Sequence, residues 1–257
     1  MPLVQNVPFA SIMLSMVFGI VSAMLPRRAA RALTIVLSAT VLALNTWLLL
    51  YLVPYGKSFT YMMGHYPAPW GNELRAGMME ALMAVVLAVV MLFSVLAGLR
   101  KLEEQVDEKK QHLFFTMLDL GLAALMALIY TNDLFTAYVF MEILTLASCA
   151  LIMARQVGHT MVAAMRYLIL SLLGSGLLLL AISLTYDLTG HLLMENIHAA
   201  MEKLVATGEY ELPITVIIGL FCVGLGIKSA LYPFHPWLPD AYSYATPIAS
   251  AVLFSLI

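Results

Sequence analysis

Apolar residues in this chain gather in long runs that are separated by short polar or charged segments. A membrane-spanning helix needs about 20 predominantly apolar residues. Six runs of this kind come first, at residues 7–25, 32–53, 77–99, 114–130, 134–153 and 168–185. With the apolar segments that follow, the pattern predicts an all-α polytopic membrane protein with about seven to eight transmembrane helices.

The seventh apolar segment, residues 213–244, is too long for one straight spanning helix at a rise of about 1.5 Å per residue. Pro233, Pro236 and Pro239 lie in its second half, where each proline removes a backbone donor and clashes with the preceding turn. We therefore predict a broken seventh helix. Its first half covers residues 213–231, an irregular link follows, and a short second half ends at residue 244. Lipid cannot satisfy the freed polar groups, so the link is expected to lie inside protein or against internal water. An eighth apolar run begins at Pro247.

Charged residues predict the orientation of these spans. The first ten residues lack the basic region of a secretory signal, so the first span is expected to be retained. Excess lysine and arginine marks the cytoplasmic side of a membrane protein. With the N-terminus outside, the inner loops hold Arg27, Arg28, Arg31, Arg100, Lys101, Lys109, Lys110, Arg155 and Arg166, whereas the outer loops hold Lys57, Arg75 and Lys203.

The composition agrees with a membrane location and gives no sign of nucleic-acid, metal or cofactor binding. The chain is 62% apolar and 11% charged, whereas a soluble domain is about 45–50% apolar and about 25% charged. The net charge of −2 gives no indication of a nucleic-acid partner. Cys149 and Cys222 lie in apolar runs without a CxxC or Cys/His cluster, so we expect packing roles for them and no metal or cofactor site in this chain.

Glu142 and Lys228 are the two ionisable residues that the apolar pattern explains least. Glu142 is eight residues into its span, about 12 Å deep, and Lys228 precedes the predicted break. Burial favours the neutral form of a lysine, whereas a nearby carboxylate favours the charged form. A pair that forms and breaks can therefore hold and release a proton. The plainer alternatives are a protonated Glu142 bonded to a neighbouring helix and a static ion pair.

Other polar residues in the membrane allow two interpretations each. His235 lies in the predicted link and is either a proton relay or a hydrogen-bonding residue that braces the break. Asp119 is either a proton-entry group or a buried protonated acid. Asp133 is expected to cap the fifth span. Asp240 is expected to cap the second half-helix or to bond a backbone amide, with a proton relay as the alternative. Small residues predict close helix packing at Ser171, Gly174, Ser175, Gly176, Gly219, Gly224 and Gly226.

Residues 191–205 predict an amphipathic helix at the outer interface. Its apolar face holds Leu193, Met194, Ile197, Met201 and Leu204, and its polar face holds Glu195, His198 and Glu202.

The stretch GIKSALYPFHPWLPDAYSYATP (residues 226–247) resembles the signature of the antiporter-like subunits of respiratory complex I. It is more similar still to the D-type subunits of Mrp cation/proton antiporters and to their relatives in membrane-bound hydrogenases and sulfane sulfur reductases. TNDLFTAYVFMEILTLASCALI and residues 163–201 extend the resemblance. The resemblance implies that Glu142 and Lys228 form the ion-translocating pair. It also implies a fold of two inverted five-helix repeats, each with a broken helix, and a subunit without redox chemistry of its own.

The resemblance covers the N-terminal half of such subunits, with residues 1–76 as a two-helix segment and 77–257 as the first repeat. It implies a proton- or sodium-translocating subunit of a multi-subunit redox or Mrp-type complex in a prokaryotic cell membrane. The expected partners are the lipid bilayer and other membrane subunits, including a chain that completes the second repeat. The alternative is a structural membrane subunit, a truncated half that no longer conducts. A self-sufficient secondary transporter is a third interpretation, against which the single repeat argues.

Overall fold

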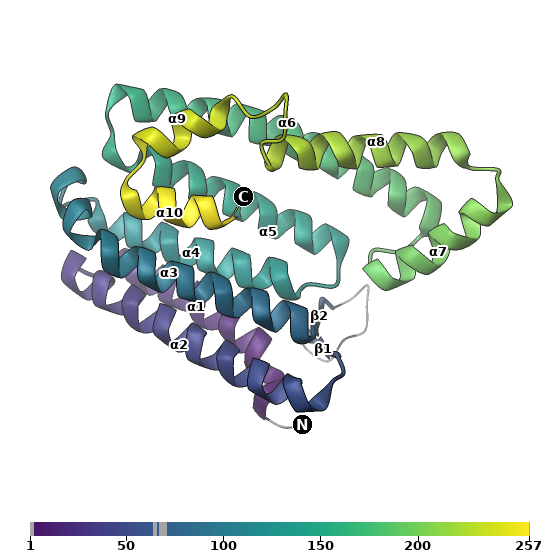
Figure 1. The fold of residues 1–257 in the computed structure, drawn as a ribbon, viewed down its shortest axis with the longest axis horizontal. Coiled ribbons are helices and arrows are strands. Elements are labelled where there is room, and N and C mark those ends of the chain that lie inside the picture. The colour runs from purple at the N-terminus through teal and green to yellow at the C-terminus, as the bar shows by residue number, and fades with distance from the viewer. Residues whose placement is uncertain (1–2, 64–65, 67–70, 257) are drawn as a thin grey trace.

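The computed structural model describes residues 3–63, 66 and 71–256 (Figure 1). Seven helices in these ranges are long and apolar enough to span a bilayer. They are α1 (Val7–Met24), α2 (Arg27–Tyr55), α3 (Met78–Gln105), α4 (Gln111–Tyr130), α5 (Leu134–Ile152), α6 (Gly158–Thr189) and α8 (Glu211–Lys228). The shorter helices are η1 (Leu3–Asn6), η3 (Met153–Arg155), α7 (Met194–Thr207), α9 (Trp237–Tyr244) and α10 (Pro247–Leu256). The chain is thus an all-α polytopic membrane protein, as its apolar pattern predicts.

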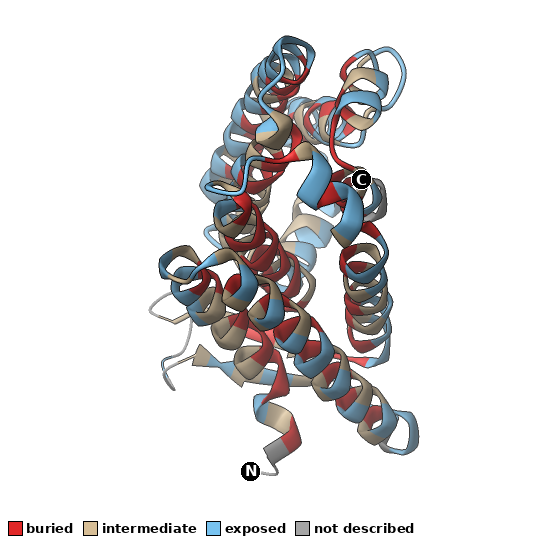
Figure 2. Cartoon of the chain, turned by 90° about the vertical axis from the view of Figure 1, so that its left-hand side faces the viewer, coloured by how far each residue is buried: buried red, intermediate tan, exposed pale blue. Residues whose placement is uncertain are grey.

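Helix α4 lies at the centre of the bundle. It packs against α1, α2, α3 and α5, and most of its side chains are buried. Phe115, Leu118, Leu122 and Met126 form a buried ridge along it. Figure 2 shows the buried residues concentrated on the inward faces of the helices and the exposed residues on the outside. The outward faces carry many large apolar side chains, as expected where lipid replaces water.

Helix α8 lies along α6 at the other side of the molecule (Figure 1). Two glycines allow this close approach. A Cβ atom at Gly174 would lie 3.0 Å from Ile227 Cγ2, and one at Gly224 would lie 2.7 Å from Leu178 Cγ. Gly176 and Gly219 have no described atom within 4 Å of such a Cβ, so the predicted packing role is wrong for these two.

The chain leaves the helical conformation between α8 and α9, across residues 229–236. Helix α8 ends at Lys228 rather than at residue 231. A hydrogen-bonded C-cap closes it: Leu231 N donates to Gly226 O at 2.9 Å and Ala230 N donates to Ile227 O at 3.3 Å. Ala230 has a φ of +51°, the left-handed conformation that this C-cap requires.

A small antiparallel hairpin joins α2 to α3, and the apolar pattern did not predict it. Strand β1 (Phe59–Met62) pairs with β2 (Glu73–Ala76), with Phe59 opposite Ala76 and Met62 opposite Glu73. Leu74 makes a further bridge to Thr131, and Asp133 makes one to Leu193. These bridges connect the ends of helices that are distant in sequence, close to the first turn of α5.

Two helix boundaries differ from the predicted ones in a way that matters below. Helix α2 begins at Arg27, not at residue 32, so the three arginines predicted in a loop belong to its first turns. Helix α3 continues to Gln105 through the charged segment.

The amphipathic helix predicted at residues 191–205 is present as α7, with Ile197, Met201 and Leu204 half-buried. The predicted domain limits at residues 1 and 257 lie outside the described residues.

Candidate ion-translocation site

Three helices bring their polar side chains together around Glu142. Lys228 Nζ, at the last residue of α8, lies 3.1 Å from Glu142 Oε1 on α5. The same ammonium group donates to Thr145 Oγ1 at 2.7 Å. Ser175 on α6 donates its hydroxyl to Glu142 Oε1. The carboxylate therefore accepts hydrogen bonds from two other helices.

The spacing of these residues follows from helix geometry. Glu142 and Thr145 are three residues apart, so both face the same side of α5. Ser175 Oγ is also 2.8 Å from Ser171 O, one turn earlier on α6. A serine hydroxyl has a single proton to donate. Ser175 can therefore bond either Glu142 or its own helix, which gives the carboxylate a donor that can be withdrawn.

Glu142 and Lys228 are both partly buried. The exposed fraction of the side chain is 13% for Lys228 and 23% for Glu142. Opposite charges at this distance compensate each other's loss of hydration. The C-terminal end of a helix also favours a cation, and Lys228 occupies that end of α8. The position thus gives the ammonium group two electrostatic partners, the carboxylate of Glu142 and the C-terminal end of α8.

A cavity of about 210 Å³ adjoins the pair. Its polar wall includes Thr145, Ser148, Tyr167, Ser171 and Lys228. The rest of its wall is apolar and includes Leu128, Met141, Leu144 and Leu225. Lys228 therefore lies between a carboxylate on one side and a cavity with a narrow polar wall on the other.

Asp119 does not join this pair. It is fully buried on α4, and its Oδ2 accepts a hydrogen bond of 3.0 Å from Thr34 on α2. Gly121, two residues later, faces Ala147 of α5. Asp119 therefore faces away from α5, into the contact between α1, α2 and α4. Its Oδ1 and the nearby buried Ser22 Oγ have no hydrogen-bond partner among the described residues.

His235 also stands apart from the pair. Its side chain is exposed in the link between α8 and α9 and stacks on Tyr232 at a ring-centroid distance of 5.7 Å. In the described part of the chain it makes no hydrogen bond or ion pair with Glu142 or Lys228. The geometry brings together two of the four predicted translocation residues, Glu142 and Lys228.

The prolines divide between the link and the helix that follows. Pro233 lies in the link, and Pro236 directly precedes α9. Pro239 lies in the first turn of α9, where a missing N–H group is tolerated. Pro239 therefore lies in the helix that follows the link and not in the link itself.

Acidic residues at helix ends show both a success and a failure of sequence reasoning. Asp133 caps α5, since Thr136 N donates to its Oδ1 at 2.6 Å. Asp240 does not cap α9 as expected, because its carboxylate forms an ion pair with Arg166 of α6.

Sequence reasoning assigned Ser175 to helix packing and missed its bond to Glu142. The signal available was its spacing of four residues from Ser171, which places both hydroxyls on one face.

Comparisons with known proteins show which proteins this chain is similar to. The family model described as NADH:quinone oxidoreductase/Mrp antiporter, TM, matches residues 131–257, which include Glu142 and Lys228. NADH-quinone oxidoreductase subunit N of Desulforudis audaxviator is 35% identical over 190 residues. That alignment covers 74% of this chain and 36% of the relative, so the chain spans well under half of that protein's length.

Two solved structures share the fold. A chain of the Mrp complex from Dietzia sp. DQ12-45-1b superposes with a TM-score of 0.81 at 23% identity, over 98% of this chain and 46% of that one. A chain of the membrane-bound sulfane sulfur reductase, an archaeal respiratory membrane complex, gives a TM-score of 0.79 at 24% identity, over 95% of this chain and 52% of that one. The antiporter-like membrane fold is therefore present in nearly the whole chain.

Proposed function

Residues 131–257 belong to the NADH:quinone oxidoreductase/Mrp antiporter transmembrane family, and from that membership we propose that this chain carries protons within a multi-subunit membrane complex of the redox-driven or Mrp type. The observation that carries the proposal is the ion pair between Glu142 and Lys228, 3.1 Å apart on different helices. The relatives named above are subunits or chains of such complexes. By this proposal the chain has no catalytic chemistry of its own.

Lys228 is the proton carrier in this proposal. While Glu142 is ionised and close, the pair holds the proton on the ammonium group. When the carboxylate is drawn away or neutralised, the partly buried ammonium loses its compensating charge and releases the proton toward the adjoining cavity. The alternative bonding of Ser175, to Glu142 or to Ser171 O, supports a carboxylate that can shift between two states.

Protons suit this arrangement better than sodium ions. A lysine ammonium has three donors and no acceptor, so it repels a metal cation while it is charged. Sodium and other hard cations are held by several oxygen ligands. Around Lys228 Nζ the bonded oxygens come from Glu142 and Thr145, and both are already used by the ammonium group.

The test replaces Lys228 with alanine in the assembled complex, reconstituted in vesicles that contain a pH-sensitive dye. We expect proton movement to fall at least tenfold, because the carrier is gone. Lys203→Ala is the matched control, since Lys203 lies exposed on α7, away from the pair. In a redox-driven complex, an ionophore that collapses a sodium gradient should leave the wild-type signal unchanged.

Equal proton movement by the Lys228→Ala variant and the wild type would contradict the proposal. It would favour a structural membrane subunit that retains the family motif without conducting. Assembly of the variant, checked by co-purification of its partner subunits, separates loss of transport from loss of the complex.

A further inference from the structure

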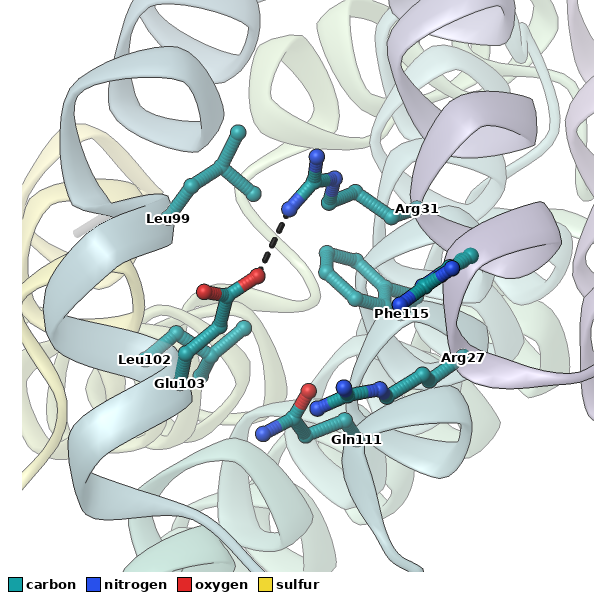
Figure 3. A pocket seen from close by; sticks show the side chains of 8 residues that line it. Arg27, Arg31, Leu99, Leu102, Glu103, Gln111 and Phe115 are labelled. Carbon is teal, nitrogen blue, oxygen red and sulfur yellow. Dashed lines mark hydrogen bonds and ion pairs between the residues drawn. The ribbon is translucent and has the colours of Figure 1, made fainter. Parts of the chain in front are cut away.

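A second polar site lies at the end of the bundle where α2 begins, α3 ends and α4 begins. It is a pocket of about 410 Å³. Arg27, Arg28 and Arg31 line it from α2, Glu103 from α3, and Gln111 and Phe115 from α4. Figure 3 shows Arg31 reaching from α2 to Glu103 on α3, with Phe115 between Arg31 and Arg27 in this view. The site has no residue in common with the Glu142–Lys228 pair.

Two of the three arginines are partly neutralised. Arg31 Nη1 lies 2.6 Å from Glu103 Oε1, and Arg27 Nη1 lies 2.5 Å from Glu108 Oε1. A guanidinium group has five donors in a rigid fork. Each ion pair therefore fixes the direction of its arginine while leaving N–H groups available for another acceptor.

Arg28 carries the excess charge. It lines the pocket and has no hydrogen bond or ion pair within the described residues. Helix α2 adds to this charge, because a helix N-terminus has a partial positive charge. The first turn of α2 contains no acidic residue, and no side chain caps it. Glu103 and Glu108 offset two of the three arginines, so Arg28 and the helix dipole remain without a counter-charge among the described residues.

The rest of the lining is mixed. Leu99, Leu102 and Phe115 are apolar, whereas Glu103 and Gln111 are polar, and Leu102 and Phe115 are almost fully buried. Leu96, one turn before Leu99 on α3, is exposed on the outward face of the helix. The pocket therefore suits the anionic group of an amphiphile whose chain extends along the outward apolar faces of the helices. The pocket also lies at the end of the bundle with the excess of lysine and arginine, which in membrane proteins faces the cytoplasmic leaflet. That leaflet carries anionic lipids, which basic pockets between helix ends bind.

We infer that this pocket binds the phosphate headgroup of an anionic phospholipid. Arginine forks match phosphate oxygens in geometry and charge. A free phosphate ion offers the same oxygens but, unlike a lipid, gains nothing from the bilayer and the outward apolar faces of the helices. The proposed ligand is therefore a lipid such as phosphatidylglycerol, held by Arg28 together with the free donors of Arg27 and Arg31.

Native mass spectrometry of the full chain in neutral detergent tests this inference, with phosphatidylglycerol and phosphatidylcholine titrated separately. We expect one phosphatidylglycerol molecule to bind in preference to phosphatidylcholine. Arg28→Ala should weaken that binding about fivefold, the effect of one surface arginine on an anionic lipid. Arg28→Lys should retain most of it. Arg100→Ala is the matched control, because Arg100 is on the same end of the bundle, is 93% exposed and does not line the pocket.

Two results would overturn the inference. The first is equal loss of phosphatidylglycerol by the Arg28→Ala and Arg100→Ala variants, which would indicate a diffuse attraction by surface charge. The second is displacement of the lipid by an equimolar amount of inorganic phosphate, which would assign the pocket to a soluble anion. Arg28 makes no bond to the described residues, so Arg28→Ala should keep the wild-type melting temperature, and a change of several degrees would also count against a ligand-specific role.

Discussion

Glu142 combines a structural contact between helices with the transport role proposed for it. Its carboxylate accepts bonds from Lys228 and Ser175, so its charge stabilises the contact of α5 with α6 and α8. Position in the apolar runs, together with the family resemblance, selected Glu142 and Lys228 from the sequence, because an ionisable group in the bilayer is costly unless it is paired or hydrated. The same reasoning could not separate Asp119 from them, since the direction a side chain faces depends on how α4 is rotated among its neighbours.

Glu142→Gln should destabilise the protein by about 1–2 kcal/mol, because it leaves a partly buried ammonium without its anion. Adding Lys228→Met should recover most of that loss, since no uncompensated charge remains. Thermal unfolding of both single variants and the double variant gives the coupling energy of the pair. If the losses of the two single variants simply add, the two side chains do not interact. Neither the Glu142→Gln variant nor the double variant should transport protons.

The break between α8 and α9 shows what a pattern of residues predicts at the scale of an element. The prolines indicated a break, but the helix ends before the first of them, at Lys228. The actual stop is the C-cap in which Ala230 adopts a left-handed conformation. Glycine usually occupies that position, so a sequence with alanine there gives no signal. The hairpin of β1 and β2 was missed for a related reason, because two four-residue strands are shorter than the span-length pattern resolves.

Ala230→Gly should stabilise the protein by about 0.5–1 kcal/mol, because glycine adopts a positive φ without a Cβ clash. Ala199→Gly is the matched control. Ala199 is exposed within helix α7, and glycine there should cost about 0.5–1 kcal/mol. Chemical unfolding in detergent measures both changes. A destabilisation at both positions would show that the C-cap does not strain Ala230.

At the scale of the whole molecule, the chain combines a central α4 core with an α6–α8 arm that carries Lys228. The number and order of the spans were predictable, because lipid imposes a minimum length on each apolar run. The contacts between spans were harder to predict from the sequence, because in lipid these contacts depend on close packing at sites such as Gly174 and Gly224. The chain spans about half of the two solved relatives. By the proposed function, the rest of the transport path would come from residues outside this chain, as a multi-subunit complex implies.

Proton movement by a complex that contains the Lys228→Arg variant tests the central claim most directly. Arginine keeps the positive charge and can still pair with Glu142, but it does not release its proton at ordinary pH. If Lys228 carries protons, this variant should assemble with near wild-type stability and lose transport at least tenfold, as Lys228→Ala does. If Lys228→Arg moves protons as fast as the wild type, the ion pair is structural and the protons take another route.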